Sequence, residues 1–190
     1  KEAIEYYRLI KAQSDLNITT LFDPNIDNNG AAHDKAAGLL EIVEDYNQKF
    51  GQDFTFATHA KFKKDIAARL GHKKPYAHIA KNPEQQINLL IVVDQMLTGF
   101  DSKWLNTLYL DKVIKYENII QAFSRTNRLF NEIEKPFGTI RYYRKPHTME
   151  QHINRAVKLY SGDKPIALFV QRLESNLNKL NAIFKEIAEL

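Results

Sequence analysis

One stretch of sequence decides the fold: residues 87–101 read Ile-Asn-Leu-Leu-Ile-Val-Val-Asp-Gln-Met-Leu-Thr-Gly-Phe-Asp. The nearly unbroken apolar run at its start is typical of a strand buried on both faces of a parallel sheet. The run then gives way to a loop in which Thr98 and Gly99 lie between two carboxylates, Asp94 and Asp101. A glycine after a buried strand allows positive φ or a close approach of ligand to backbone. We therefore predict a parallel sheet with a ligand-binding loop at the carboxyl end of this strand.

Strand and helix patterns alternate on both sides of this stretch. Apolar residues at helical spacing predict helices, one of which is capped by Asp34 and ends at Gly51. The segment 71–86, with two prolines and many charges, is predicted to be a loop. The predicted helices are 2–13, 34–50 and 59–70, residues 116–123 are predicted to start another helix, and the further strands are 17–22, 107–110 and 138–143. Such alternation indicates an α/β fold built from right-handed βαβ units, with a parallel sheet flanked by helices.

No strand pattern remains after His147, so we predict a helical extension. Residues 149–160 and 165–190 have helical patterns, and we place a soft boundary near Lys145, which gives domains 1–145 and 146–190. Apolar residues recur at helical spacing from Ile166 to Ile187. Such a stripe must pack on something, and core within the same chain is the commoner outcome.

Composition narrows the class of protein. Hydrophobic residues make up 44% and charged residues 26% of the 190 residues, the balance of a soluble globular domain. The sequence has no run of membrane-spanning length and no signal-peptide pattern. Cysteine is absent, which excludes disulfides and thiolate zinc sites, and a cytoplasmic location is expected. The chain starts at Lys1 without an initiator methionine, so we expect a piece of something longer.

Basic residues are concentrated in two places. Seven Lys or Arg residues occur between Lys61 and Lys81 against a single acid, Asp65, and a second cluster comprises residues 141, 144 and 145. Such patches can neutralise phosphates, although a solvated helix face has the same pattern. The role of the 61–81 segment stays open at this point.

A second segment carries the chemistry: residues 121–128 read Gln-Ala-Phe-Ser-Arg-Thr-Asn-Arg. Arg125 and Arg128 are three residues apart and would share one helix face, with Gln121 one turn before Arg125. Arginine suits a polyphosphate because its planar fork binds phosphate oxygens and keeps its proton. Two surface arginines in salt bridges would be the simpler alternative. The Thr-Gly-Phe-Asp element upstream favours the polyphosphate site.

These two segments carry a family resemblance. Residues 91–101 resemble motif V of superfamily 2 helicases and translocases, and residues 121–128 resemble motif VI. Taken together, these sequences resemble the restriction (R) subunit of type I restriction-modification enzymes, over roughly residues 1–145. The resemblance implies the second RecA-like domain of an ATP-driven translocase on double-stranded DNA, whose full subunit also carries an endonuclease domain.

The resemblance also implies roles for particular residues. Arg125 and Arg128 would reach ATP across a cleft, and Gln121 would couple the nucleotide state to domain closure. Gly99 and Asp101 would border the nucleotide, and Thr98 would face the DNA backbone. The expected partners are double-stranded DNA, the first RecA-like domain, and the methyltransferase and specificity subunits, with no membrane.

The sequence lacks two elements that ATP hydrolysis needs. It contains neither a Gly-x-x-x-x-Gly-Lys-Ser/Thr phosphate loop nor an Asp-Glu acid pair for Mg²⁺. These belong to the first RecA-like domain, so ATP and Mg²⁺ are expected in the full-length subunit only. No residue spacing completes a metal site, and the isolated fragment is expected to be inactive.

Two alternatives remain. A nuclease would use Asp94 and the D-x-K triplet formed by Asp101, Ser102 and Lys103 to hold Mg²⁺. That triplet would have to lie on a paired strand, whereas its surroundings indicate a loop. The other alternative is a non-catalytic interaction module whose helical tail docks the methyltransferase or specificity subunits. The apolar stripe between 166 and 187 fits that role.

Overall fold

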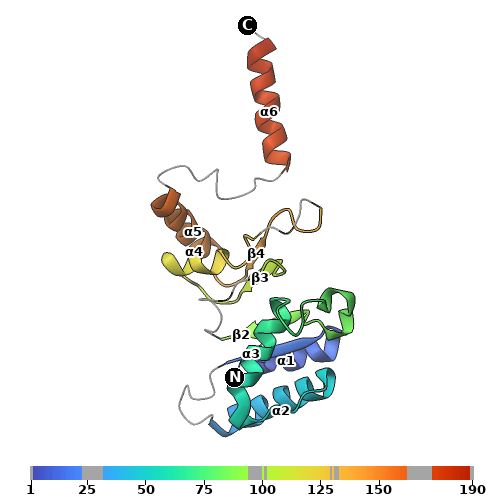
Figure 1. The fold of residues 1–190 in the computed structure, drawn as a ribbon. Coiled ribbons are helices and arrows are strands. Elements are labelled where there is room, and N and C mark those ends of the chain that lie inside the picture. The colour runs from blue at the N-terminus through green and yellow to red at the C-terminus, as the bar shows by residue number, and fades with distance from the viewer. Residues whose placement is uncertain are drawn as a thin grey trace.

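The structure is a computed structural model that describes most of the chain, namely residues 2–22, 32–93, 100, 102–128, 130, 133–161 and 173–188. Within these residues, four short strands form two parallel two-stranded sheets with helices beside them (Figure 1). The predicted α/β class with parallel pairing is confirmed, and the arrangement is consistent with a RecA-like fold. We call residues 2–93 the first unit and residues 100–161 the second unit.

The first unit contains one sheet and its own core. Its elements are α1 (Glu2–Gln13), β1 (Ile18–Leu21), α2 (Ala32–Phe50), α3 (His59–Leu70) and β2 (Leu89–Val92). β1 and β2 run parallel, with Ile18 opposite Leu89 and Leu21 opposite Val92. Helices α1 and α2 contact β1. The core is rich in aromatic and branched side chains, including Tyr7, Leu21, Leu39, Ile42, Tyr46, Phe62 and Ile66.

Three details of this unit differ from the sequence prediction. α2 begins at Ala32, so Asp34 lies inside the first turn and does not cap it. Gly51 ends this helix as predicted, at a φ of +64° that glycine adopts without steric cost. β2 is shorter than predicted and its side chains are half-buried. Burial on both faces was therefore the wrong expectation, because β2 pairs with β1 alone among the described strands.

The segment between α3 and β2 contains more structure than a plain loop. Two short 3₁₀ helices, Ile79–Lys81 and Pro83–Gln85, interrupt it, and a third, Phe56–Thr58, precedes α3. Ile79 is buried within this segment. The segment is thus folded against the first unit, although its sequence pattern is polar.

The second unit repeats the strand–helix–strand pattern. Its elements are β3 (Thr107–Leu110), α4 (Glu117–Phe123), β4 (Thr139–Tyr142) and α5 (Pro146–Ser161). β3 and β4 run parallel, with Leu110 opposite Tyr142. A second core forms where α4 and α5 meet this sheet, and its buried members include Leu110, Ile114, Ile119, Ala122, Met149 and Ala156. Because Met149 and Ala156 belong to α5, the helix after residue 145 packs with the strands before it. The domain division at residue 145 itself stays a prediction.

The last helix stands apart from both units. α6 (Leu173–Ala188) extends away from the other elements in Figure 1. Its apolar side chains are exposed, among them Leu177, Leu180, Ile183 and Phe184. The intramolecular core predicted for this stripe is therefore absent from the described part of α6, while residues 166–172 lie outside the description. No helix among the described residues combines the length and apolar character needed to cross a membrane.

Candidate functional site

The segment predicted to carry two arginines on one helix face ends its helix before them. α4 ends at Phe123, and the Ser124 N–H donates to the carbonyl of Ile120 (2.9 Å). The next two N–H groups, of Arg125 and Thr126, donate to carbonyls only three residues back. This tight turn carries Arg125 out of the helix, so the shared helix face was the wrong geometry.

Arg125 is half-buried and held on three sides by neutral oxygens. Its Nε donates to the carbonyl of Gln121 (3.0 Å), and one terminal nitrogen donates to the hydroxyl of Ser124 (2.9 Å). The other terminal nitrogen donates to the carbonyl of Phe100. These contacts use three of the five N–H groups of the guanidinium. The contact with Phe100 also joins the motif V-like stretch to the motif VI-like stretch across 25 residues of sequence.

Lys135 is a buried cation that sequence reasoning missed. Its side chain is almost fully buried, and its ammonium donates to the carbonyls of Arg128 and Lys103. Burial lowers the pKa of Lys135. A lysine between Glu134 and Pro136 in a polar stretch has no pattern that predicts burial. The hydrogen bond from Lys135 holds the backbone carbonyl of Arg128, while the Arg128 side chain is exposed.

Gly138 permits the close packing of the arginine turn on β4. A Cβ atom at this position would lie 2.2 Å from the carbonyl oxygen of Thr126, which is buried. Because Gly138 directly precedes β4, the turn lies at the amino-terminal edge of the β3–β4 sheet. This position follows because α4 comes after β3 and runs back toward the start of the next parallel strand. The predicted location was the carboxyl end of a different strand, β2, and it stays a prediction.

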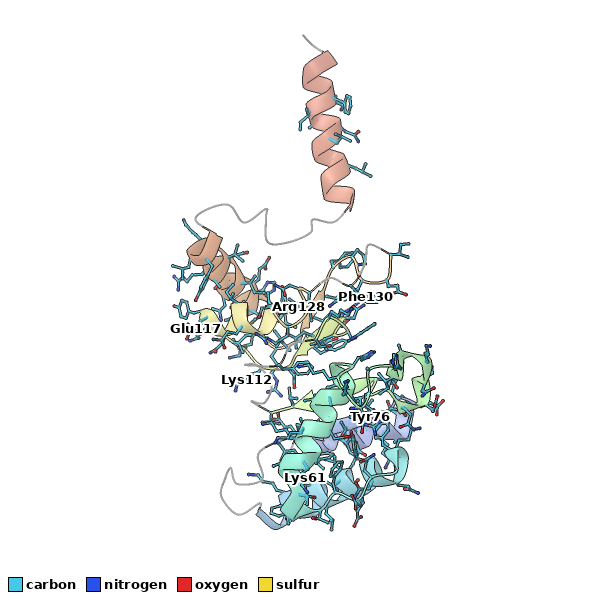
Figure 2. All side chains as sticks on the ribbon, in the orientation of Figure 1. Lys61, Tyr76, Lys112, Glu117, Arg128 and Phe130 are labelled. Atoms are coloured by element: carbon cyan, nitrogen blue, oxygen red, sulfur yellow. The ribbon has the colours of Figure 1, made fainter. Side chains whose placement is uncertain are left out.

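An aromatic stack connects this site to the end of α3. The rings of His72 and Trp104 are stacked with centroids 4.0 Å apart, and Phe130 lies 4.4 Å from Trp104 on the other side. The hydroxyl of Ser102 donates to the carbonyl of Leu70 (2.8 Å). Burial, together with the nearby Lys103 charge, lowers the pKa of His72. Phe130 and Arg128 are both labelled in Figure 2.

Several predicted site residues lie outside the described residues. They are Asp94, Thr98, Gly99 and Asp101. Of the described ones, the structure brings Arg125 against the backbone of Gln121 and leaves the side chains of Gln121 and Arg128 exposed. Within the described part of the chain, no group of three His, Cys, Asp or Glu side chains is placed to hold a metal ion. Ser102 of the D-x-K triplet is buried and bonded to α3.

Comparison with known proteins identifies the family. Residues 1–145 match the family model described as Type I restriction enzyme subunit R domain 3. A type I restriction enzyme endonuclease subunit of Staphylococcus aureus (strain COL) is 37% identical over 172 residues, which is 83% of this chain and 17% of that protein. A corresponding subunit of Staphylococcus saprophyticus is 42% identical over 123 residues, 65% of this chain and 12% of that protein.

The match extends beyond bacteria of one genus. A putative type I restriction enzyme endonuclease subunit of Methanocaldococcus jannaschii is 30% identical over 132 residues, covering 65% of this chain and 12% of the relative. The sequence and the family model agree, so this chain belongs to the R-subunit family of type I restriction enzymes. It spans about a sixth of the length of the curated relatives it matches.

Proposed function

We propose that this chain is the second RecA-like half of a motor that moves double-stranded DNA at the expense of ATP before cleavage. The observation that carries the proposal is the hydrogen bond from Arg125 to the carbonyl of Phe100. It joins the two segments whose sequences resemble motifs V and VI. A motor needs these segments to respond together, because one borders the nucleotide and the other supplies charge to it.

The local electrostatics suit an anionic ligand. The described acceptors of Arg125 are two carbonyls and one hydroxyl, and those of Lys135 are two carbonyls. Neutral acceptors orient a cation without cancelling its charge, so the net charge of both groups remains available to phosphate oxygens. Arg125 has at most two N–H groups left to donate, and the backbone carbonyl of Arg128 is anchored by Lys135. We therefore assign γ-phosphate contact to both arginines, as the family pattern does.

The remaining assignments follow the family pattern. Gly99 and Asp101 would border the nucleotide, Gln121 would report its state, and Thr98 would contact a DNA phosphate. ATP with Mg²⁺ would be held mainly by the first RecA-like domain of the same subunit, because this chain has no phosphate loop. The 190-residue chain alone is accordingly expected to show no ATP turnover.

The expected partners follow from the same proposal. DNA would be gripped through its phosphate backbone, so binding should depend little on sequence and fall steeply with salt. Sequence recognition would come from the specificity subunit, working with the methyltransferase subunit. The assembly would act in the cytoplasm, where its DNA substrate is found.

The test is DNA-stimulated ATPase of the complete parent subunit, with DNA binding measured on the same preparations. Arg125→Ala and Arg128→Ala should each lower turnover, by about 10³-fold for the arginine that contacts the γ-phosphate, and leave DNA binding intact. Arg155→Ala is the matched control, since Arg155 is an exposed arginine on α5. Unchanged turnover in both site variants would remove the motor assignment.

A second candidate function is a docking module, and the exposed apolar side chains of α6 favour it. Replacing Leu180 and Phe184 with Gln in the complete subunit separates the two functions. Loss of co-purification with the methyltransferase and specificity subunits, with ATPase retained, would support docking through α6. Retention of the complex would exclude that role for the helix.

A further inference from the structure

Exposed lysines gather on α3 and the segment that follows it. We call this set the basic surface, which consists of Lys61, Lys64, Lys73, Lys74 and Lys81, all exposed. α3 turns Phe62, Ile66 and Arg69 into the core of the first unit, so its opposite side meets solvent. Figure 2 shows Lys61 on this helix. Ala60, also exposed, lies on the same helix.

The acid nearest to these lysines in sequence is bonded to other side chains. Asp65 is the sole acidic residue between 61 and 81. It accepts hydrogen bonds from the hydroxyl of Tyr46 (2.6 Å), the Nε of Arg69 (3.0 Å) and the hydroxyl of Tyr76. Its charge is therefore committed to Arg69, which is itself 2% exposed. Within residues 61–81, the positive charge of the lysines is therefore not balanced by Asp65.

The same buried network fastens the two groups of lysines together. Arg69 lies between the rings of Phe50 and Tyr76, 4.3 Å and 4.1 Å from their centroids. Its terminal nitrogens donate to the carbonyl of Gln85 (3.0 Å) and to the hydroxyl of Tyr76 (3.1 Å). Tyr76 and Gln85 flank Lys81 in sequence. The segment after α3 is thus bonded to the helix at both places, and a ligand need not order it on binding.

Apart from Asp65, the nearest acidic residues in sequence lie toward the margins of this region. Asp53 precedes α3 by six residues, and Glu84 lies in the 3₁₀ helix after Lys81; both are exposed. The five lysines of the basic surface outnumber these two acids. Lysine is a compact point charge on a flexible stem, suited to phosphates whose spacing varies, rather than to one fixed ligand.

We infer that the basic surface binds the phosphate backbone of double-stranded DNA. The inference rests on the proposed function and assigns the surface that meets the duplex. At 1.5 Å per residue, the 12 residues of α3 extend about 18 Å, which matches about five base pairs of duplex. Lysine contacts to phosphate carry no base information, so the surface grips DNA of any sequence. An acidic protein partner would need carboxylates to match the lysines and is the alternative that the test excludes.

The test measures binding of the complete parent subunit to a duplex without a recognition site, in the absence of ATP and over a range of salt. The double variants Lys61→Gln/Lys64→Gln and Lys73→Gln/Lys74→Gln each remove two charges. Losing two phosphate contacts should make the slope of log K against log salt shallower by about 1.8 and weaken binding at 0.1 M salt by roughly 10- to 60-fold. Lys64→Glu should weaken binding further than Lys64→Gln.

A matched control removes the same charge elsewhere. Lys49→Gln/Lys115→Gln changes two exposed lysines outside the basic surface, at the end of α2 and before α4. Its salt slope should equal that of the wild type, and urea midpoints of all variants should agree, because none of these lysines is in a core. If the basic-surface variants keep the wild-type salt slope and DNA affinity, the inference is overturned, even if they lose ATPase turnover or the binding of a protein partner.

The outcome is separable from that of the proposed function. The basic-surface variants should regain full ATPase turnover at saturating DNA, because the arginine site is untouched. Arg125→Ala and Arg128→Ala should keep DNA affinity and lose turnover. If the basic-surface variants do not behave as expected, the result for the arginine variants is unaffected, and the reverse also holds.

Discussion

The two units hold their buried cations in opposite ways. In the first unit, Arg69 is paired with the carboxylate of Asp65 and enclosed by two rings. In the second unit, the described acceptors of Arg125 and Lys135 are carbonyl and hydroxyl oxygens. A carboxylate cancels the charge that it orients, whereas a carbonyl orients the charge and leaves its net value intact. The difference is what the proposed function requires: a cation that stabilises the fold in the first unit and cations whose charge can act on an anionic ligand in the second.

The largest expected effect on stability comes from breaking the paired cation. Arg69→Ala would leave the half-buried Asp65, whose side chain is 14% exposed, without its counter-charge, which costs about 3 kcal/mol in the free energy of unfolding. Urea denaturation of the 190-residue chain measures the loss. Arg8→Ala is the control, because Arg8 forms an exposed pair with Glu41 (2.5 Å), and such pairs contribute about 1 kcal/mol or less. Equal losses in the two variants would contradict the structural role of Arg69.

A smaller effect on stability, with a clear effect on activity, is expected from replacing Lys135. Lys135→Met keeps the length of the side chain but removes the donor to the carbonyls of Arg128 and Lys103. The cost should be about 1–3 kcal/mol in unfolding free energy. Because the backbone at Arg128 is then unanchored, DNA-stimulated ATPase of the parent subunit should fall by about tenfold or more with DNA affinity unchanged.

Lys115→Met controls for the loss of a lysine from the same unit, since Lys115 is exposed. Lys135→Met with wild-type turnover would show that the buried ammonium is only structural. In that case, Arg125 would be the one cation of the comparison that neutral oxygens hold for a functional purpose.

The smallest expected effect is a decrease in the stability of the first unit at alkaline pH. Burial, with a hydrogen bond to Asp65, raises the pKa of Tyr76 to about 12, and burial also raises the pKa of Tyr46 and of Tyr7. In the unfolded chain tyrosine ionises near pH 10. Above that pH the unfolded state binds fewer protons than the folded state, so stability falls as the pH rises from 10 toward 12.

This pH dependence can be measured as a decrease in the urea midpoint between pH 9 and pH 11, with tyrosinate absorbance recorded in parallel. Tyr76→Phe removes one of the three groups and should make the decrease shallower. A midpoint that does not change over this range would show that these hydroxyls are not part of the folded network.

The family, the fold class and most elements could be predicted from local patterns. α3 and β3 have the predicted boundaries, and α1 matches within the described residues, because helical and strand periodicity are properties of neighbouring residues. The decisive pair of segments was also visible, since Arg125 and Arg128 stand in a distinctive run. The end of α4 at Phe123 could not be predicted from local patterns, because the turn that follows it packs Thr126 against Gly138, which is distant in sequence.

The sequence alone therefore determined the family, a type I restriction enzyme R-subunit domain, and singled out the residues proposed to act: two arginines, a Thr-Gly loop and a lysine-rich segment. Only the tertiary structure decided which groups these and the neighbouring charges contact. Asp65 faces inward, Lys135 is buried on two carbonyls, and Arg125 contacts Phe100 25 residues away. Periodicity reports the environment of a side chain relative to its neighbours. The partner of a charge is chosen by contacts between distant segments, and these exist only in the folded chain.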